Sequence, residues 1–162
     1  MKKVALVMGS ESDLPVMKKA ADTLRELSVP FETHVFSAHR TPEEAKDFFS
    51  AAEDNGFGVV VCAAGMAAHL AGAAAANTTL PVIGIPCRGG ALDGLDALLA
   101  TVQMPSGLPV ATVALNGGVN AALLAAQIIA LSEPKLSAAL KQRRENDKNK
   151  VLEADRGIAD RI

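Results

Sequence analysis

Gly58-Val59-Val60-Val61-Cys62-Ala63, near the middle of the chain, is a continuous apolar run without a charged side chain. Such a run is typical of a strand that is buried on both faces, as at the centre of a parallel sheet. Residues 4–8, close to the N-terminus, have the same character. The two runs therefore predict buried strands at the core of a sheet.

Helix-like segments alternate with the apolar runs along the chain. Ser12 or Asp13 can cap the first helix, and Thr41, followed by Pro42, can cap the second. Alternation of this kind predicts an α/β fold: a three-layer, doubly wound parallel sheet of the flavodoxin-like order 2-1-3-4-5. We expect Pro86 to end the fourth strand. The expected strands are residues 4–8, 31–36, 58–63, 81–85 and 110–114, and the expected helices are residues 12–27, 41–55, 65–76, 92–100 and 116–131.

The sequence changes character after Pro134, where basic and acidic side chains alternate. We expect residues 1–135 to form a flavodoxin-like catalytic domain and residues 136–162 to form an additional C-terminal helix. We predict that this extension packs on a neighbouring subunit, and a helix solvated on all sides is the alternative. The apolar side chains that would make the contact are Leu136, Leu140, Val151 and Leu152.

The composition limits the class of protein. The formal net charge of -2 gives no electrostatic reason to expect nucleic acid as a partner. The longest apolar stretch, residues 59–76, is rich in alanine and contains Gly65, His69 and Gly72, so we expect no membrane span. Two cysteines are too few for a disulfide framework, and Met1-Lys2-Lys3 runs straight into a strand. We therefore expect no signal peptide and a cytoplasmic protein with reduced thiols.

Three loops follow the first three expected strands and carry the polar side chains best suited to chemistry. In a parallel sheet of order 2-1-3 these loops are neighbours at the carboxyl edge, where ligands bind. The first loop brings Ser10 and Asp13, the second brings His39 and Arg40, and the third brings His69. The topology therefore predicts one crevice that contains all five side chains.

Each of these residues has a functional and a structural interpretation. His39 is the best candidate for proton transfer because an imidazole titrates near neutrality, and Arg40 can bind a phosphate bidentately. Alternatively, Arg40 pairs with Glu43 or Glu44 while His39 merely packs. His69 follows two alanines and could equally be a buried structural histidine. We assign no role to His34, which occupies an ordinary strand position. Arg88 could face solvent, belong to a lid or come from a neighbouring site.

Several classes of site are not indicated. The Gly9-Ser10 loop matches neither a Walker loop nor a dinucleotide fingerprint, although its amides could hold a phosphate or a ribose. The two cysteines lack CxxC spacing and the histidines lack an acidic ligand cluster, so we expect no metal. There is no GxSxG motif of a serine hydrolase, and the absence of Trp and Tyr argues against a flavin platform.

Five motifs occur in an order and at a spacing that resemble the class I 5-(carboxyamino)imidazole ribonucleotide mutases of purine biosynthesis. The resemblance covers roughly residues 3–140. It implies conversion of 5-carboxyaminoimidazole ribonucleotide to 4-carboxy-5-aminoimidazole ribonucleotide, without a cofactor, in a cytoplasmic homo-octamer. The motifs are Gly9-Ser10-Glu11-Ser12-Asp13, Ser37-Ala38-His39-Arg40-Thr41-Pro42, Gly65-Met66-Ala67-Ala68-His69-Leu70, Gln103-Met104-Pro105-Ser106-Gly107 and residues 120–126.

The resemblance also implies roles for individual residues. It gives His39 and His69 as the catalytic pair, with His39 as general acid and base, and Arg40 as the phosphate ligand. The chain departs from the family pattern in three places: Met66 replaces a common Gly, Ala71 replaces a common Pro, and Gly89-Gly90 replaces a Ser-containing segment. The implied substrate-binding residues are Ser10, Ser12, Asp13, Ser37, Ala38, Arg40, Gly65, Ala67, Ala68 and Leu70.

Two alternative functions stay open at this point. The first is a related carboxylase that fixes free carbon dioxide onto aminoimidazole ribonucleotide; the family's carboxylase branch has Lys after the motif histidine, where this chain has Arg40. The second is a non-catalytic signalling or nucleotide-binding domain of flavodoxin-like fold. A receiver domain would need an acidic side chain after the third strand, and this chain has Ala63-Ala64 there.

Overall fold

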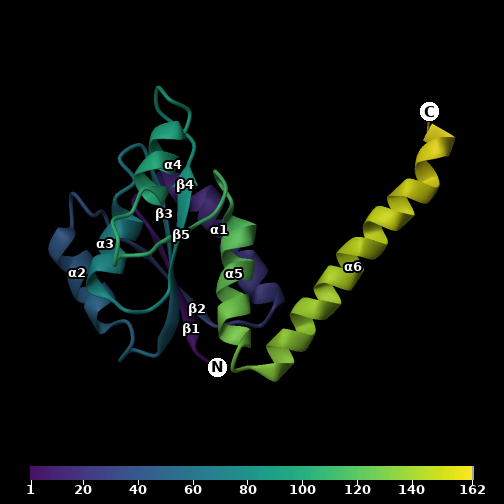
Figure 1. The fold of residues 1–162 in the computed structure, drawn as a ribbon, viewed down its shortest axis with the longest axis horizontal. Coiled ribbons are helices and arrows are strands. Elements are labelled where there is room, and N and C mark those ends of the chain that lie inside the picture. The colour runs from purple at the N-terminus through teal and green to yellow at the C-terminus, as the bar shows by residue number, and fades with distance from the viewer. Residues whose placement is uncertain (162) are drawn as a thin grey trace.

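The computed structural model describes residues 1–161 and shows a five-stranded parallel sheet of order β2-β1-β3-β4-β5 (Figure 1). This confirms the predicted flavodoxin-like order, in which the second strand lies outside the first. The strands are β1 (Lys3–Met8), β2 (Phe31–Val35), β3 (Phe57–Gly65), β4 (Val82–Cys87) and β5 (Ala111–Thr112).

Helices cover both faces of the sheet (Figure 1). The first and fifth helices pack against each other on one face, and the second and third pack together on the other. The three predicted layers are therefore present. The helices are α1 (Leu14–Glu26), α2 (Pro42–Ala51), α3 (Leu70–Asn77), α4 (Leu95–Val102), α5 (Gly118–Ala130) and α6 (Pro134–Ile158), with short 3₁₀ turns η1 (Glu11–Asp13) and η2 (Ala159–Arg161).

Strand β3 is the central element of the core, as its apolar run predicts. Val59 and Val61 face the layer of α1 and α5, whereas Val60 and Cys62 face the layer of α2 and α3. All four side chains are at most 1% exposed. Burying one valine side chain stabilises a fold by roughly 1.5–3 kcal/mol, so a strand with apolar side chains on both faces belongs at the centre of the sheet.

Strand β4 continues to Cys87, so the expectation that Pro86 ends it is wrong. The Pro86 carbonyl accepts a hydrogen bond from the Asn116 amide at 2.9 Å, on the side where β5 has already ended. In a strand the N–H and C=O of one residue point to the same side. The missing amide hydrogen of proline therefore costs no ladder bond there.

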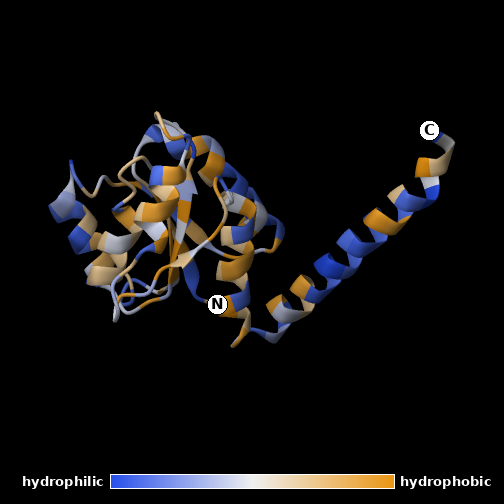
Figure 2. Cartoon of the chain, turned by 45° about the horizontal axis from the view of Figure 1, so that its top comes forward, coloured by the Kyte–Doolittle hydropathy of each residue, from blue (hydrophilic) through white to orange (hydrophobic). Residues whose placement is uncertain are grey.

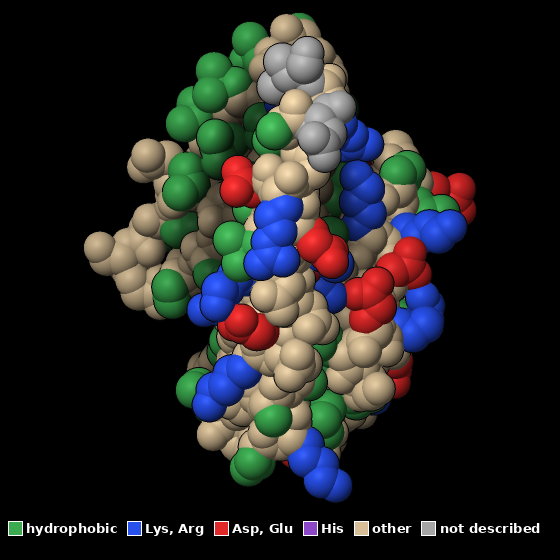
Figure 3. Space-filling model, turned by 90° about the vertical axis from the view of Figure 1, so that its right-hand side faces the viewer, with side chains coloured by type: hydrophobic (Ala, Val, Ile, Leu, Met, Phe, Trp, Pro, Cys, Tyr) green, Lys and Arg blue, Asp and Glu red, His purple; other side chains and the backbone are tan. Residues whose placement is uncertain are grey.

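Helix α6 differs from every other helix in its packing. Leu136 is its one buried side chain among the residues described, and Leu140 packs partly against the core. Beyond these residues the helix projects away from the sheet, and its middle part is hydrophilic (Figure 2). Lys and Arg side chains alternate with Asp and Glu on its outer side (Figure 3).

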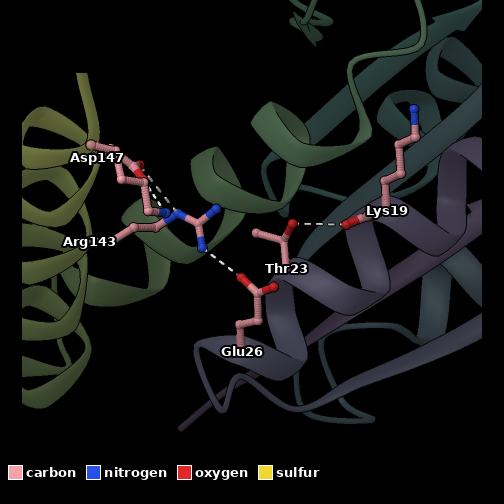
Figure 4. A network of polar contacts seen from close by, with 6 residues as sticks. Lys19, Thr23, Glu26, Arg143 and Asp147 are labelled. Carbon is pink, nitrogen blue, oxygen red and sulfur yellow. Dashed lines mark hydrogen bonds and ion pairs between the residues drawn. The ribbon is translucent and has the colours of Figure 1, made fainter. Parts of the chain in front are cut away.

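One polar network joins α6 to α1 beyond the buried start of the helix (Figure 4). The Arg143 Nη1 donates to the Glu26 carboxylate of α1 at 2.7 Å, across 117 positions of sequence. Arg143 also lies 4.0 Å from the Asp147 carboxylate, one helical turn further along α6. The predicted contact of residues 136–162 with a neighbouring subunit stays a prediction, and residue 162 lies outside the described residues.

No helix within residues 1–161 is both long and apolar enough to cross a lipid bilayer.

Candidate active site

A cavity of about 680 Å³ opens at the carboxyl ends of β1, β3 and β4. The topology brings the three predicted loops together there, because parallel strands end at the same edge of the sheet. The lining residues are Gly9, Ser10, Ser12, Asp13, Ser37, Ala38, His39, Arg40, Ala64, Gly65, Met66, Ala67, His69, Leu70, Arg88, Gly89 and Gly90. Every predicted site residue lies in this list except Ala68, whose side chain is buried within the third loop.

Ser37 organises the second loop. Its hydroxyl oxygen accepts hydrogen bonds from the amides of His39 and Arg40, at 3.3 and 3.1 Å. The Thr41 hydroxyl accepts from the Ser37 amide at 2.8 Å and donates to the Ser37 carbonyl at 3.1 Å. Thr41 therefore closes this loop, and the expectation that its side chain caps α2 is wrong. Two hydroxyls hold a short loop from both ends, so the backbone that carries the imidazole and the guanidinium is fixed.

His39 and His69 contact each other across the cavity. The His39 Nε2 lies 2.8 Å from the His69 Nδ1, and the two rings meet edge to face at 76° with centroids 4.9 Å apart. A hydrogen bond between two imidazoles needs one ring to donate and the other to accept. The pair can therefore hold one proton between its rings and pass it from one ring to the other.

Both histidines are exposed towards the cavity, so the interpretation of His69 as a buried structural histidine is wrong. The third histidine, His34, behaves differently. Its ring stacks on Phe36 at an interplanar angle of 7° and packs against Phe48, and it is absent from the cavity lining. Its packing agrees with the prediction that His34 is an ordinary strand residue.

Arg40 is held by the loops instead of by a carboxylate. Its Nε donates to the Ser37 hydroxyl at 3.5 Å, and its Nη2 donates to the Gly9 carbonyl at 3.4 Å. Neither Glu43 nor Glu44 is its partner within residues 1–161, so that alternative is wrong. Both contacts are long and the side chain is exposed, so the guanidinium keeps donors that can bind an anion.

The first loop places a carboxylate in the cavity wall. The Ser10 hydroxyl accepts the Ser12 amide at 3.4 Å and so begins the η1 turn, whereas neither Ser12 nor Asp13 caps α1 as predicted. The Asp13 side chain makes no capping hydrogen bond, and the residue is only 8% exposed. Burial raises the pKa of its carboxyl, and hydrogen bonds from the Cys87 thiol and the Ser10 backbone offset only part of that effect.

Cys87 lies at the end of β4 beside Asp13. Burial, followed by the negative charge of Asp13, raises the pKa of the Cys87 thiol to about 12. The thiol is therefore protonated near neutral pH and can donate to the carboxylate. Cys62 is buried as well, and both cysteines are free thiols, as predicted.

The fourth loop supplies lining residues that the sequence did not assign to the site. Arg88 pairs with Asp93 at 3.1 Å, and its amide donates to the Asn116 side chain at 2.9 Å. It brings a second guanidinium to the cavity, next to Gly89 and Gly90. A signal was present in the sequence, because this loop also follows a parallel strand and therefore ends at the same edge of the sheet.

Met66, one departure from the family pattern, has an unusual backbone conformation. Its φ is +47°, a left-handed conformation that glycine adopts freely and that other residues adopt rarely. The common Gly of the resembled family therefore suits this backbone, whereas Met is strained in it.

The described residues 1–161 include no group of three His, Cys, Asp or Glu side chains arranged to hold a metal.

Comparisons with known proteins agree with the motifs. The model of a family described as AIR carboxylase matches residues 3–150. The N5-carboxyaminoimidazole ribonucleotide mutases of Pyrococcus horikoshii and Bacillus subtilis are each 51% identical to the chain. Each match covers 93% of this chain, together with 85% and 94% of the respective relatives. The phosphoribosylaminoimidazole carboxylase of Schizosaccharomyces pombe is 49% identical, but only 27% of its length is matched.

A solved structure shows the same architecture. The crystal structure of Treponema denticola PurE superposes with a TM-score of 0.84 at 28% sequence identity, over 94% of this chain and 95% of that one. The likeness thus extends over nearly the whole chain.

Proposed function

The chain belongs to the AIR carboxylase family, and on that premise we propose that it is an N5-carboxyaminoimidazole ribonucleotide mutase of purine biosynthesis, an isomerase. The observation that carries the proposal is the near end-to-end match to relatives with that name. It covers 93% of this chain and 85% to 94% of the relatives. The reaction moves a carboxylate from the exocyclic nitrogen of an aminoimidazole ribonucleotide to a ring carbon.

Different parts of the cavity would bind the phosphate, the ribose and the base of such a nucleotide. Arg40 would bind the phosphate, with Ser10, Ser12 and the nearby loop amides as further donors. The Asp13 carboxylate, held by Cys87, would accept hydrogen bonds from the ribose hydroxyls. The residues proposed to surround the base are Ser37, Ala38, Gly65, Ala67, Ala68 and Leu70.

His39 would carry the proton that the reaction needs. As the bond between the carbamate carbon and the exocyclic nitrogen breaks, its electron pair stays on nitrogen and the His39 proton goes there, which releases carbon dioxide. The ring carbon then attacks carbon dioxide, a carbon–carbon bond forms, and the ring carbon gives its proton to His39. The imidazole ends as it began, so one group serves as acid and then as base.

His69 would hold His39 in the productive orientation. The 2.8 Å contact fixes one nitrogen of the His39 ring and lets the second ring share the proton during the step in which His39 is neutral. This assigns His69 a role on the proton path next to the carboxylate, in agreement with the resemblance. The small side chains of the cavity keep aminoimidazole ribonucleotide and carbon dioxide close together, which favours their recombination.

The reaction is redox-neutral, and transfer of carbon dioxide and of one proton accounts for every bond broken and formed, so we propose that no cofactor takes part. We also propose a homo-octamer, in which α6 packs on a neighbouring subunit. Exposed apolar side chains on α4 would be covered in such an assembly: Leu95, Leu99 and Val102, which are 46% to 53% exposed. A cytoplasmic location would keep Cys62 and Cys87 reduced.

A carboxylase that fixes free carbon dioxide is the second candidate, because the 49% identical Schizosaccharomyces pombe relative has that name. The test is to assay the purified protein with the carbamate at low bicarbonate, and separately with aminoimidazole ribonucleotide and bicarbonate. A mutase converts the carbamate rapidly and needs very high bicarbonate for the second reaction. Turnover that depends on bicarbonate in both assays would overturn the mutase proposal in favour of the carboxylase.

A further inference from the structure

Met66 stands in a position that neither folding nor the proposed proton path explains. Its side chain is 61% exposed although it is large and apolar, and its backbone is left-handed with φ +47°. It lines the cavity in the loop between β3 and α3, three residues before His69. Strain of this kind persists where the surrounding structure holds it in place, and such positions gather at functional sites.

The fourth loop is shaped around this methionine. A Cβ added at Gly90 would lie 3.1 Å from the Met66 Cγ and 3.5 Å from its Sδ. Gly90 has φ +68°, and Gly89 beside it has φ +146°. The lack of a side chain at Gly90 thus lets the loop pass close to the Met66 side chain, and both residues line the cavity.

We propose that Met66 and Gly90 together close the mouth of the cavity, and that the Met66 side chain keeps carbon dioxide inside between its release and its recapture. This inference rests on the proposed mutase function and deepens it. Met66 is then a specificity-determining residue that favours return of carbon dioxide to the ring over its loss to solvent.

The chemistry favours an apolar, flexible barrier at this place. Carbon dioxide is small and has no net charge, so no ion pair can hold it, and its retention depends on a closed passage. A methionine side chain is unbranched and adapts to irregular gaps, so it can let a nucleotide enter and then fill the opening. Loss of carbon dioxide would leave aminoimidazole ribonucleotide, and recombination would then need bicarbonate from solution.

The test follows a label in the carboxylate. The carbamate substrate, labelled with ¹³C in its carboxylate, is turned over in unlabelled bicarbonate, and the ¹³C content of the carboxylated product is measured by mass spectrometry. Spontaneous loss from the substrate is subtracted with an enzyme-free sample. The variants are M66A and M66G, which remove the barrier, and M66L, which keeps its apolar bulk.

We expect M66A and M66G to raise the label lost per product formed at least fivefold, and M66L to retain label almost as well as the wild type. The matched control is L131A, which trims an 89% exposed apolar side chain at the end of α5, outside the cavity. It should lose no more label than the wild type. M66A and M66G with wild-type retention would overturn the inference, while wild-type turnover of the carbamate would leave the proposed function intact.

A double-variant cycle tests the pairing with Gly90. G90A should raise label loss because its methyl group displaces the Met66 side chain, and M66A/G90A should lose no more label than M66A alone. Full addition of the two effects would show that Gly90 acts apart from Met66, and would overturn the pairing. A wild type that fails to convert the carbamate would overturn the proposed function and this inference with it.

Discussion

The cavity edge of the sheet and helix α6 differ in how closely their residues follow local sequence preferences. At the cavity edge, single residues depart from local preference: Asp13 is a buried carboxylate and Met66 has a left-handed backbone. Helix α6 keeps the local rules, with ion pairs three residues apart such as Lys148 with Glu145. Yet the cavity edge has a defined place in the core, whereas most of α6 has none within the protomer (Figure 1).

The difference shows what each kind of sequence information specifies. Local pairs stabilise a helix by about 0.2–0.5 kcal/mol each but say nothing of its position. Long-range packing fixes position and can hold a few unfavourable residues where chemistry needs them. Substitutions at the cavity edge should therefore change activity far more than stability, and substitutions on α6 should change the protomer little in either respect.

The largest expected effect is at His39. H39N should lower kcat by about 10³-fold, since general acid–base catalysis contributes roughly 10²–10⁴-fold. The nucleotide should still bind, because Asn leaves Arg40 and Asp13 in place. Steady-state kinetics with the carbamate gives kcat, and calorimetry with aminoimidazole ribonucleotide gives binding.

His34 provides the matched control for that experiment. It is the histidine that packs on Phe36 and Phe48 outside the cavity, so H34N should leave kcat within about twofold while it lowers the thermal stability. A wild-type rate in H39N would remove His39 from the proton path. An equal loss of kcat in H34N would show that activity depends on general stability and would erase the contrast between the two regions.

Arg40 should come next in size. R40A removes the guanidinium proposed to bind phosphate, and hydrogen bonds to charged groups contribute about 1.5–3 kcal/mol. KM should therefore rise roughly 10- to 100-fold, with a smaller change in kcat. Raising the salt concentration should weaken substrate binding in the wild type more than in R40A. An unchanged KM would assign the phosphate to another group, with Arg88 as the first to examine.

Substitution of Asp13 should change substrate binding and stability in opposite directions. D13N should raise KM about tenfold through a weaker ribose contact, and it should raise the melting temperature because it removes a buried charge. The stability gain must depend on pH. Burial raises the native pKa above its ordinary value of 3.8, so the wild type loses stability as pH rises from 3.8 through the native pKa.

The Asn side chain of D13N does not titrate, whereas the buried Asp13 carboxyl is neutral at low pH and charged above its native pKa. The gain in melting temperature should therefore be absent at low pH and complete above the native pKa of Asp13. Differential scanning calorimetry over this pH range measures the difference. A constant difference at all pH values would mean that Asn acts through packing and that the buried carboxylate carries no electrostatic cost.

The sequence predicted the sheet better than it predicted the site. The run at residues 58–63 identified β3 because burial on both faces has a direct signature in side-chain type. The strand order then placed His39 and His69 in one crevice, but not at 2.8 Å, because that distance depends on side-chain rotamers set by the Ser37 loop. Asp13 was predicted both as a possible helix cap and as a site residue, since a capping residue and a residue of a binding loop look alike in sequence. The structure excludes the side-chain cap and places Asp13 in the cavity lining.

Two further features had no local signal. The left-handed backbone of Met66 contradicts its side-chain preference and becomes visible only in three dimensions. The ion pair that joins α6 to α1 links Glu26 and Arg143, which are 117 positions apart. Local patterns predict elements well, whereas such single long-range contacts are fixed by the folded structure.

The smallest expected effect is at Arg143, and it tests whether one long-range pair gives α6 its place. Because the Arg143 side chain is 29% exposed and the Glu26 side chain 63%, solvent screens the pair, and R143A should lower the free energy of unfolding by only about 0.5–1 kcal/mol. The melting temperature should fall by about 1–4 °C with kcat unchanged. The matched control is K148A, which breaks the exposed pair with Glu145 inside the projecting part of α6 and should shift the melting temperature by less than about 1 °C. Equal shifts in R143A and K148A would mean that the contact with α1 adds nothing beyond a local helix pair, and that α6 is positioned by Leu136 and Leu140 alone.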